Sequence, residues 1–233
     1  MSATAIIGST GLVGSHVLST LLASGTPPTV QTISRRAPKS TGPALQATVE
    51  PDTTLWAAKL KALIPTPTTL ISALGTTRAA AGGIANQWKI DHDLNVELAQ
   101  AAKAQGVRNF VFVSSAGTRG LVASRLPYAQ MKNGVEDAIK ALDFEHAVIV
   151  RPGLIMGERE VAHQGGWLMN ATVKGLGRIA GQWAQDKLGQ DAEVIARATV
   201  AAARLAEEGK APAKYWVLEG ADIVRLGRTE WKE

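Results

Sequence analysis

The sequence predicts an α/β fold built on a doubly wound parallel sheet with helices on both faces. Short, uniformly apolar segments alternate along the chain with longer segments of helical spacing. Strands that are apolar on both sides are typical of parallel sheets buried between two helix layers. A glycine-rich turn follows the first apolar segment, which makes the predicted sheet Rossmann-type. The length of 233 residues suits one domain over residues 1–233.

The expected strands are short apolar runs, each bounded by a polar residue, a glycine or a proline. In chain order they are Ala3–Gly8, Thr29–Ser34, Ala47–Glu50, Thr69–Leu74, Asn109–Ser114 and Ala147–Arg151. The expected helices carry apolar residues at intervals of three and four, and glycines or prolines mark several of their ends. In chain order they are Gly14–Ser24, Thr54–Leu63, Asp91–Gln105 and Tyr128–Leu142.

The sequence changes in character from about Leu154, and we expect residues 154–233 to form part of a helical cover on the substrate side of the sheet. Helices are expected at Trp167–Trp183 and Glu193–Glu207, and an added strand at Tyr215–Leu218. The helix over Trp167–Trp183 carries an apolar stripe. The helix either packs with this stripe over the crevice or rests on a membrane as a basic amphipathic surface. The stripe and its basic neighbours are Met169, Val173, Leu176, Ala180, Trp183, Lys174 and Arg178.

The composition excludes several kinds of site. There is no cysteine for disulfides or thiolate metal sites, and the four scattered histidines show no metal-ligand spacing. The net charge of +5 comes without a basic run, which favours a generally basic surface over nucleic-acid binding. No apolar run approaches the roughly 18 residues of a membrane span. The first strand begins near Ala3, so we expect no cleavable targeting peptide and a cytoplasmic protein.

The turn between the first strand and the first helix has glycines at positions 8, 11 and 14. Glycines here let the backbone approach a diphosphate closely and aim a helix N-terminus at it. The spacing is GxxGxxG rather than GxGxxG, but the position between a strand and a helix supplies the context that the motif needs. We therefore expect a dinucleotide to contact Gly8, Ser9, Thr10, Gly11, Leu12 and Val13.

Arg35 and Arg36 follow the second strand. An NAD-specific site usually carries an acid near this position that hydrogen-bonds the ribose 2′-hydroxyl. Two guanidinium groups instead match a 2′-phosphate in charge and geometry. The two arginines therefore favour NADP(H) over NAD(H), and the alternative is that both are solvated loop residues.

Ser115, Tyr128 and Lys132 form the candidate catalytic set. Tyr128 and Lys132 stand four residues apart, which places both side chains on one face of a helix. Ser115 follows the preceding strand and can reach the same space from the sheet edge. A neighbouring ammonium favours the phenolate form of tyrosine, so Tyr128 can exchange a proton with a carbonyl or alcohol oxygen. Ser115 can donate a hydrogen bond to that oxygen as charge develops on it.

In their order along the chain, these motifs resemble the short-chain dehydrogenase/reductase superfamily. An atypical branch of that superfamily contains the mammalian Tat-interacting-protein oxidoreductases and their fungal relatives. The segments similar to this branch are Leu74-Gly75-Thr76-Thr77-Arg78, Phe144-Glu145, Arg151-Pro152-Gly153 and, for the fungal members, Gly157-Glu158-Arg159-Glu160. The fungal members are peripheral proteins of the mitochondrial outer membrane, so the resemblance implies contact with a membrane surface, on its cytosolic face.

The resemblance also implies roles for individual residues. It places Leu74 and Gly75 against the adenine–ribose side of the cofactor and gives Lys132 a bond to the nicotinamide ribose. Relatives tend to carry an arginine where this chain has His163, so that contact is not transferred. An asparagine of related branches falls near Asp91, which leaves a proton relay unassigned. The residues that the resemblance places around the nicotinamide are Pro152, Gly153, Leu154 and Ile155.

We therefore expect an NADPH-dependent oxidoreductase that reduces a carbonyl, or oxidises an alcohol, on a small organic substrate. The chain has no G-x-S-x-G elbow and no G-x-x-x-x-G-K-[ST] loop, which argues against a hydrolase and against an NTPase. The alternative is a regulator in which NADPH occupancy changes the affinity for a protein or membrane partner. The substrate and the oligomeric state stay open at this stage.

Overall fold

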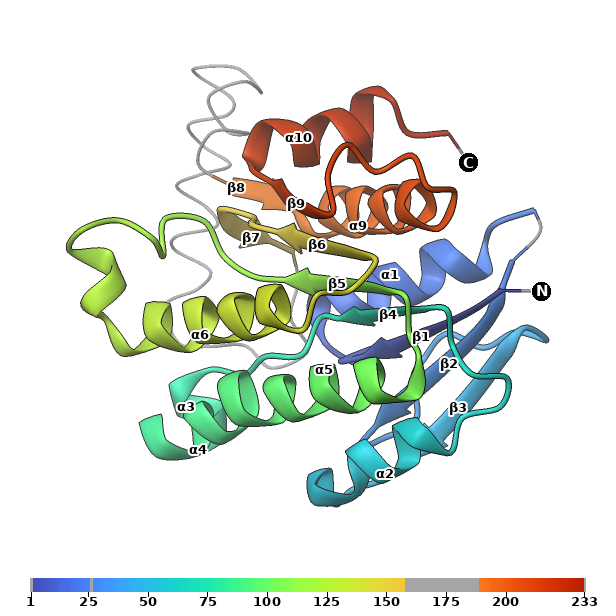
Figure 1. The fold of residues 1–233 in the computed structure, drawn as a ribbon, viewed down its shortest axis with the longest axis horizontal. Coiled ribbons are helices and arrows are strands. Elements are labelled where there is room, and N and C mark those ends of the chain that lie inside the picture. The colour runs from blue at the N-terminus through green and yellow to red at the C-terminus, as the bar shows by residue number, and fades with distance from the viewer. Residues whose placement is uncertain (1, 26, 158–188, 233) are drawn as a thin grey trace.

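The computed structural model describes residues 2–25, 27–157 and 189–232 of the chain. Its main feature is a seven-stranded sheet in the order β3-β2-β1-β4-β5-β6-β9, and every neighbouring pair is parallel (Figure 1). This architecture confirms the predicted doubly wound α/β fold. The strands are β1 (Ala3–Ile7), β2 (Thr29–Ser34), β3 (Leu45–Val49), β4 (Thr69–Ser72), β5 (Asn109–Val113), β6 (His146–Val150) and β9 (Tyr215–Leu218).

The strand order creates a switch point in the middle of the sheet. The chain runs outward from β1 to β2 and β3, then crosses back to β4 and continues outward through β5 and β6. Connections on the two sides of β1 and β4 therefore turn away from each other. Ligands of open α/β sheets bind in the crevice that this divergence leaves beyond the carboxyl ends of the strands.

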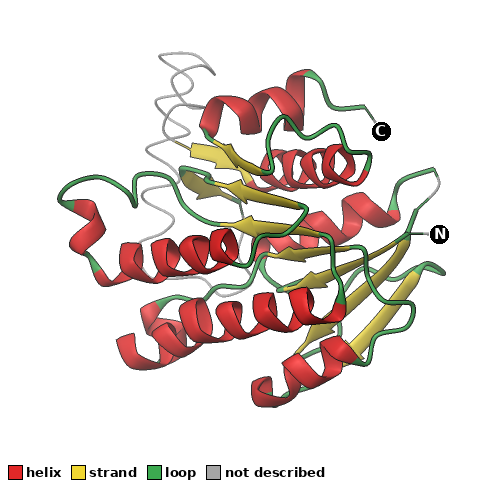
Figure 2. Cartoon of the chain, in the orientation of Figure 1, coloured by secondary structure: helices red, strands yellow, loops and turns green. Residues whose placement is uncertain are grey.

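One face of the sheet is covered by α1 (Leu12–Leu22) and α9 (Ala192–Glu207), which pack against each other (Figures 1 and 2). The buried side of α9 is rich in alanine, and small side chains allow a close approach between the helices. The short helix α10 (Gly220–Val224) packs against α9. The predicted helix over Glu193–Glu207 and the predicted strand over Tyr215–Leu218 are confirmed.

The opposite face is covered by α2 (Trp56–Lys61), α5 (Leu94–Gln105) and α6 (Pro127–Ala141) (Figure 2). Two short helices, α3 (Arg78–Ala81) and α4 (Ile84–Trp88), precede α5. A π-helical turn over residues 89–93 joins α4 to α5, so the helix begins seven residues before the predicted start at Asp91. The sequence hides this start because Gly82 and Gly83 resemble a loop and the π-helical turn breaks the 3.6-residue period.

A second, smaller sheet pairs β7 (Leu154–Met156) with β8 (Gly189–Asp191) in parallel. The helix predicted over Trp167–Trp183, with its apolar stripe, lies outside the described residues. None of the helices that the structure describes is both long and apolar enough to cross a membrane. Glu158, Arg159, Glu160 and His163 also lie outside the described part of the chain.

Candidate active site

A cavity of about 810 Å³ lies at the switch point of the sheet. Its wall is formed by the turn after β1, the loops after β2 and β4, the π-helical turn before α5, the end of β5, the first turns of α6 and one residue of β7. These segments meet because the carboxyl ends of parallel strands share one edge of the sheet. The volume is in the range of pockets that hold small ligands and cofactors.

The turn between β1 and α1 requires glycine at two positions. Gly8 has a φ of +84°, and a Cβ there would lie 2.7 Å from the carbonyl carbon and oxygen of Ala73. A Cβ at Gly14 would collide with the carbonyl oxygen of Gly8. The backbone of the turn therefore lies directly against the loop after β4, with Ser9, Thr10, Gly11, Leu12 and Val13 facing the cavity.

The hydroxyl of Ser9 is a buried polar group on this turn. Ser9 is 1% exposed, and its Oγ has no hydrogen-bond partner within the described residues. The helix that follows has Gly11 at its N-cap and no side-chain cap for its first N–H groups. Buried hydroxyls and N–H groups are normally hydrogen-bonded, so these donors fit an anionic ligand. They match the diphosphate of a dinucleotide.

The two arginines after β2 occupy different positions. Both are exposed, but Arg36 lines the cavity and donates from Nη2 to the Thr10 carbonyl oxygen at 3.5 Å, whereas Arg35 is not part of the cavity wall. Lys39 and His16 also line this end of the cavity. Neither residue was predicted from the sequence, although a lysine a few residues beyond an arginine pair is a visible signal for an anion site.

Tyr128 and Lys132 both line the cavity, from the first two turns of α6. Tyr128 is 42% exposed, and Lys132 is buried. The Lys132 Nζ donates to the Val113 carbonyl oxygen at 3.2 Å and lies 4.8 Å from the centre of the Phe112 ring. Burial lowers the pKa of Lys132, while the negative charges of Asp91 and Glu136 oppose that shift. The structure therefore brings the predicted phenol and ammonium to one wall of the cavity.

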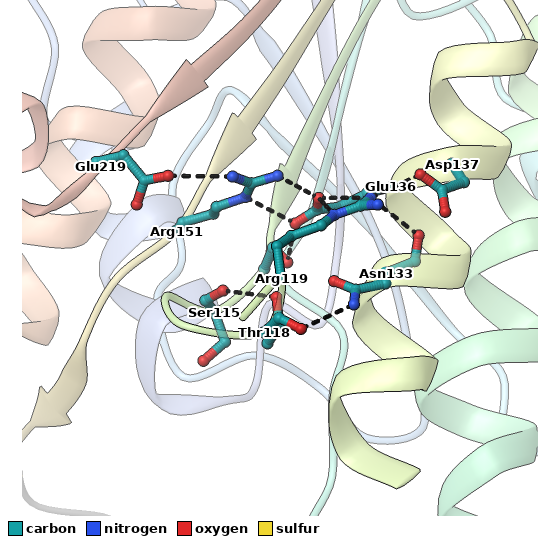
Figure 3. Close-up of polar contacts among 9 residues, drawn as sticks. Ser115, Thr118, Arg119, Asn133, Glu136, Asp137, Arg151 and Glu219 are labelled. Atoms are coloured by element: carbon teal, nitrogen blue, oxygen red, sulfur yellow. Dashed lines mark hydrogen bonds and ion pairs between the residues drawn. The ribbon is translucent and has the colours of Figure 1, made fainter. Parts of the chain in front are cut away.

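Ser115 lies elsewhere. It is half-buried on the loop after β5 and is not among the residues of the cavity wall, and its carbonyl oxygen accepts a hydrogen bond from Thr118 at 3.3 Å (Figure 3). Its neighbour Ser114 does line the cavity. The Ser114 hydroxyl, however, donates to Glu136 Oε1 at 2.6 Å. The structure thus joins Tyr128 and Lys132 at the cavity, whereas Ser115 is not among the residues that line it.

Glu136 is the buried centre of an ionic cluster, defined as Ser114, Arg119, Glu136 and Arg151, and Figure 3 shows Glu136 with the two arginines. Arg151 Nη2 lies 2.6 Å from Glu136 Oε2, and Arg119 Nη2 lies 3.1 Å from the same oxygen. Burial alone opposes ionisation of Glu136, but hydrogen bonds from Arg151 and Ser114 outweigh it, so the pKa of this carboxyl lies below its usual range. The cluster ties the end of β5 to α6 and to the end of β6.

The residues assigned by resemblance also divide into two groups. Leu74, Gly75 and Ile155 line the cavity. Pro152, Gly153 and Leu154 do not, although Ile155 follows them directly. The Gly153 N–H donates to Gln190 Oε1 at 2.8 Å, which fixes this segment beside the β7–β8 pair.

Asp91 is a cavity residue to which the sequence analysis gave no role. It is 1% exposed and lies in the π-helical turn before α5. Burial raises the pKa of its carboxyl, while Lys132 and hydrogen bonds oppose that rise. In the ranges 2–25, 27–157 and 189–232, no group of three or more histidine, aspartate or glutamate side chains is arranged to hold a metal ion.

Comparison with known proteins identifies relatives that match this chain over its whole length. The profile of the NAD dependent epimerase/dehydratase family matches residues 4–180. "Protein FMP52, mitochondrial" of Chaetomium globosum is 65% identical over 233 residues, covering 100% of both chains. "Protein fmp-52, mitochondrial" of Neurospora crassa is 64% identical over 236 residues, covering 100% of this chain and 98% of the relative.

Solved structures are similar at low sequence identity. The Bordetella bronchiseptica enzyme WbmH in complex with NAD+ superposes with a TM-score of 0.67 at 18% identity, covering 100% of this chain and 94% of that chain. A short chain dehydrogenase family protein from Francisella tularensis gives a TM-score of 0.65 at 13% identity, with 95% and 98% coverage. At these identities the structures establish a shared Rossmann-like fold.

Proposed function

Because the chain belongs to the NAD-dependent epimerase/dehydratase family, we propose that it is an NADPH-dependent oxidoreductase acting on a carbonyl or alcohol of a small organic substrate. One observation carries the proposal. Tyr128 and Lys132 line the same cavity as the glycine turn whose buried Ser9 hydroxyl lacks a partner among the described residues. The proposed proton-transfer group and the proposed dinucleotide cradle would therefore share one space.

In this proposal residues from the glycine turn to α6 would hold the cofactor in the cavity. Gly8 and residues 9–13, of which 9–13 line the cavity, would hold the diphosphate through backbone N–H groups and the Ser9 hydroxyl. Arg36, helped by Lys39, binds the 2′-phosphate, and Leu74 and Gly75 contact the adenine–ribose side. The segment 152–155 borders the nicotinamide, with Ile155 as its cavity-facing residue.

The chain's own residues then handle the proton and the orientation of the substrate. When bound, NADPH would supply a hydride to the carbonyl carbon. Tyr128 gives its hydroxyl proton to the carbonyl oxygen, and the alcohol product leaves with both hydrogens. Lys132 stabilises the resulting phenolate with its ammonium and bonds the nicotinamide ribose. Ser115 keeps its proposed role of donating a hydrogen bond to the substrate oxygen, although it is not among the residues that line the cavity.

The position of Ser115 favours a second candidate function. Because Ser115 is not part of the cavity wall, the polar donor that the reaction needs does not face the cavity directly. A protein that binds NADPH and changes its affinity for a protein or membrane partner, with little turnover, needs the cradle but not the serine. The two functions separate on turnover.

The decisive experiment measures NADPH oxidation with a panel of carbonyl substrates. We expect Tyr128→Phe to lower activity at least a hundredfold while cofactor binding survives. The chain has two tyrosines, so Tyr215→Phe is a matched control. Tyr215 lies on β9, its pKa is raised to about 12 mainly by burial, and its loss is expected to leave turnover unchanged. NADPH-gated partner binding without oxidation of any carbonyl would favour the regulator instead.

The preference for NADPH has its own test. NADPH is expected to raise the melting temperature more than NADH at equal concentration, because binding to the native state stabilises it by mass action. Arg36→Ala is expected to remove most of the difference, since Arg36 faces the cavity. Arg35→Ala is the matched control, since Arg35 lies outside the cavity wall. An unchanged preference for NADPH in the double variant, Arg35→Ala with Arg36→Ala, would show that neither arginine recognises the 2′-phosphate.

The names of the fungal relatives place those proteins in mitochondria. Combined with the resemblance to peripheral outer-membrane proteins, this supports a location in the cytoplasm, on the cytosolic face of the mitochondrial outer membrane. Protease treatment of intact mitochondria tests the location: the protein is expected to be degraded without lysis of the outer membrane.

A further inference from the structure

The cavity contains a buried carboxylate that the proposed reaction does not use. Asp91 Oδ1 accepts a hydrogen bond from the Thr76 backbone N–H at 2.6 Å, and Asp91 Oδ2 accepts one from Gln87 Nε2 at 3.1 Å. Its side chain lines the cavity from the π-helical turn before α5, whereas Lys132 lines it from α6. Aspartate is almost never fully buried unless it is paired, so this carboxylate needs a functional or electrostatic reason.

The fold holds Asp91 in this place through the π-helical turn. Asn95 Nδ2 donates to the carbonyl oxygens of Ile90 at 3.1 Å and Asp91 at 3.2 Å. Asn95 Oδ1 in turn accepts a hydrogen bond from the Ser72 hydroxyl at 2.7 Å. The turn is thereby fastened to the end of β4, and π-helical turns of this kind occur frequently at functional sites.

Gly75 shows how closely Asp91 and Lys132 approach. A Cβ at position 75 would lie 3.7 Å from Asp91 Oδ1 and 3.9 Å from Lys132 Nζ. The carboxylate and the ammonium therefore border one small space, in which glycine contributes no side chain. In this partly dehydrated wall their attraction is stronger than it would be in water.

The other groups around Lys132 do not replace Asp91. Glu136 lies one turn further along α6, but its oxygens are occupied by Arg151, Arg119 and Ser114. From β5, Lys132 meets the Val113 carbonyl oxygen and the face of the Phe112 ring. Among the described residues that line the cavity, the other ionisable side chains besides Tyr128 on α6 are His16, Arg36 and Lys39 near the glycine turn, and none of these three is an acid.

We propose that Asp91 is a positioning residue that acts through Lys132: its carboxylate keeps the buried ammonium protonated and directed along the cavity wall. The inference rests on the proposed function for its purpose, since only a charged Lys132 can stabilise the Tyr128 phenolate and attract the cofactor. The electrostatic pairing itself exists in the protein without cofactor. Burial favours the neutral amine of Lys132, and the negative charge of Asp91 opposes this effect. The negative charge of Glu136 is shared with two arginines.

The primary experiment measures the titration of Lys132 in the cofactor-free protein by NMR of ¹³C- and ¹⁵N-labelled lysine, with the signal assigned through Lys132→Arg. In Asp91→Asn, the midpoint is expected at least one pH unit below that of the unaltered protein. Asp91→Glu is expected to recover at least half of this shift. Asp93→Asn is the matched control in the same π-helical turn, because Asp93 is exposed and pairs with His92.

A midpoint that stays within 0.3 pH units in Asp91→Asn would overturn the proposal. If Asp91→Asn does not fold, the reciprocal measurement decides, because the coupling between two titrating groups is mutual. Lys132→Met is then expected to raise the midpoint of the ¹³C-labelled Asp91 carboxyl by at least one unit. An unchanged Asp91 midpoint would equally overturn the proposal.

A second readout separates this inference from the proposed function. The dissociation constant of NADPH is measured by fluorescence as the pH is raised. In both proteins it is expected to rise at least tenfold as Lys132 loses its proton, and in Asp91→Asn this rise is expected at a lower pH than in the unaltered protein. Failure of the unaltered protein to bind NADPH would reject the proposed function, while the Lys132 titration would still decide the role of Asp91. Normal binding with identical pH profiles would reject the role of Asp91 alone.

Discussion

Two buried charges one turn apart on α6 have opposite environments. Glu136 receives two hydrogen bonds from Arg151, two from Arg119 and one from Ser114. Lys132 has one carbonyl oxygen, one aromatic face and the Asp91 carboxylate across the space at Gly75. The pKa of Glu136 is lowered, which favours its charged form. Burial also lowers the pKa of Lys132, but for a lysine this favours the neutral form.

The difference separates a structural charge from a functional one. A buried ion with a full set of partners holds strands and helices together, and removing it leaves those partners uncompensated. A buried ion with few partners, in the wall of a cavity, retains the capacity to bind something that arrives from outside. The four predictions below test this contrast, from the largest expected effect to the smallest.

The largest effect is expected for Glu136→Gln. It leaves Arg151, which is mostly buried, and the adjacent Arg119 without their shared counter-charge, so we expect a loss of about 3 kcal/mol in the free energy of unfolding. Urea denaturation measures it. Asp137→Asn is the matched control on the neighbouring residue: Asp137 also pairs with Arg119, but it is exposed, so its loss should cost less than about 1 kcal/mol. Equal losses would contradict the contrast.

The second prediction concerns acid. Because the folded-state pKa of Glu136 is below its usual value, the cluster stabilises the fold above about pH 4.5 and loses that contribution as the pH falls through the lowered pKa. Stability measured from pH 6 downward is therefore expected to fall more steeply in the unaltered protein than in Glu136→Gln. Parallel curves would show that Glu136 does not carry this dependence.

The third prediction concerns the other charge. Lys132→Met keeps the length of the side chain and removes an ammonium that has fewer polar partners than Glu136, so the free energy of unfolding is expected to fall less than in Glu136→Gln. NADPH binding is expected to weaken at least tenfold, which isothermal titration calorimetry measures. A loss of stability similar to that of Glu136→Gln would mean that Lys132 is structural after all.

The smallest effect is expected for Gly75→Ala. The added methyl group would meet Asp91 and Lys132 at ordinary van der Waals distances, so stability should stay within about 0.5 kcal/mol. Thermal unfolding measures this, and Gly14→Ala is the contrasting variant, since its Cβ would collide with the Gly8 carbonyl oxygen. A large loss in Gly75→Ala would show that the space between the two charges is already filled.

Much of the fold was predictable from sequence because parallel strands are apolar on both sides. The strands at β1, β4, β5 and β6 were found for this reason, and the resemblance to the atypical branch is confirmed by the fungal relatives. The edge strand β3 was found with a shifted start, because none of its five residues is buried and three are exposed, so the strand has no buried face to show a pattern. The α3–α4 region was missed, since short helices have no periodicity to read.

The site was only partly predictable. The glycine turn and the Tyr128–Lys132 pair are local motifs, so spacing along the chain was enough to find them. The Glu136 cluster joins β5, α6 and the end of β6 with the loop that carries Arg119, and its pairing depends on how those elements pack. Asp91 needed the π-helical turn to be known. Ser115 and Ser114 differ by one residue, and the sequence cannot say which one faces a cavity.

The π-helical turn also has a consequence for how this pocket can change. Such a turn contains one residue more than the α-helical turn it replaces. Losing a single codon between positions 89 and 93 would restore a regular helix and rotate the preceding segment by about 100° relative to α5. A one-residue indel, which leaves the sheet and α6 untouched, is therefore a simple evolutionary route by which a descendant could gain or discard the acid in its pocket.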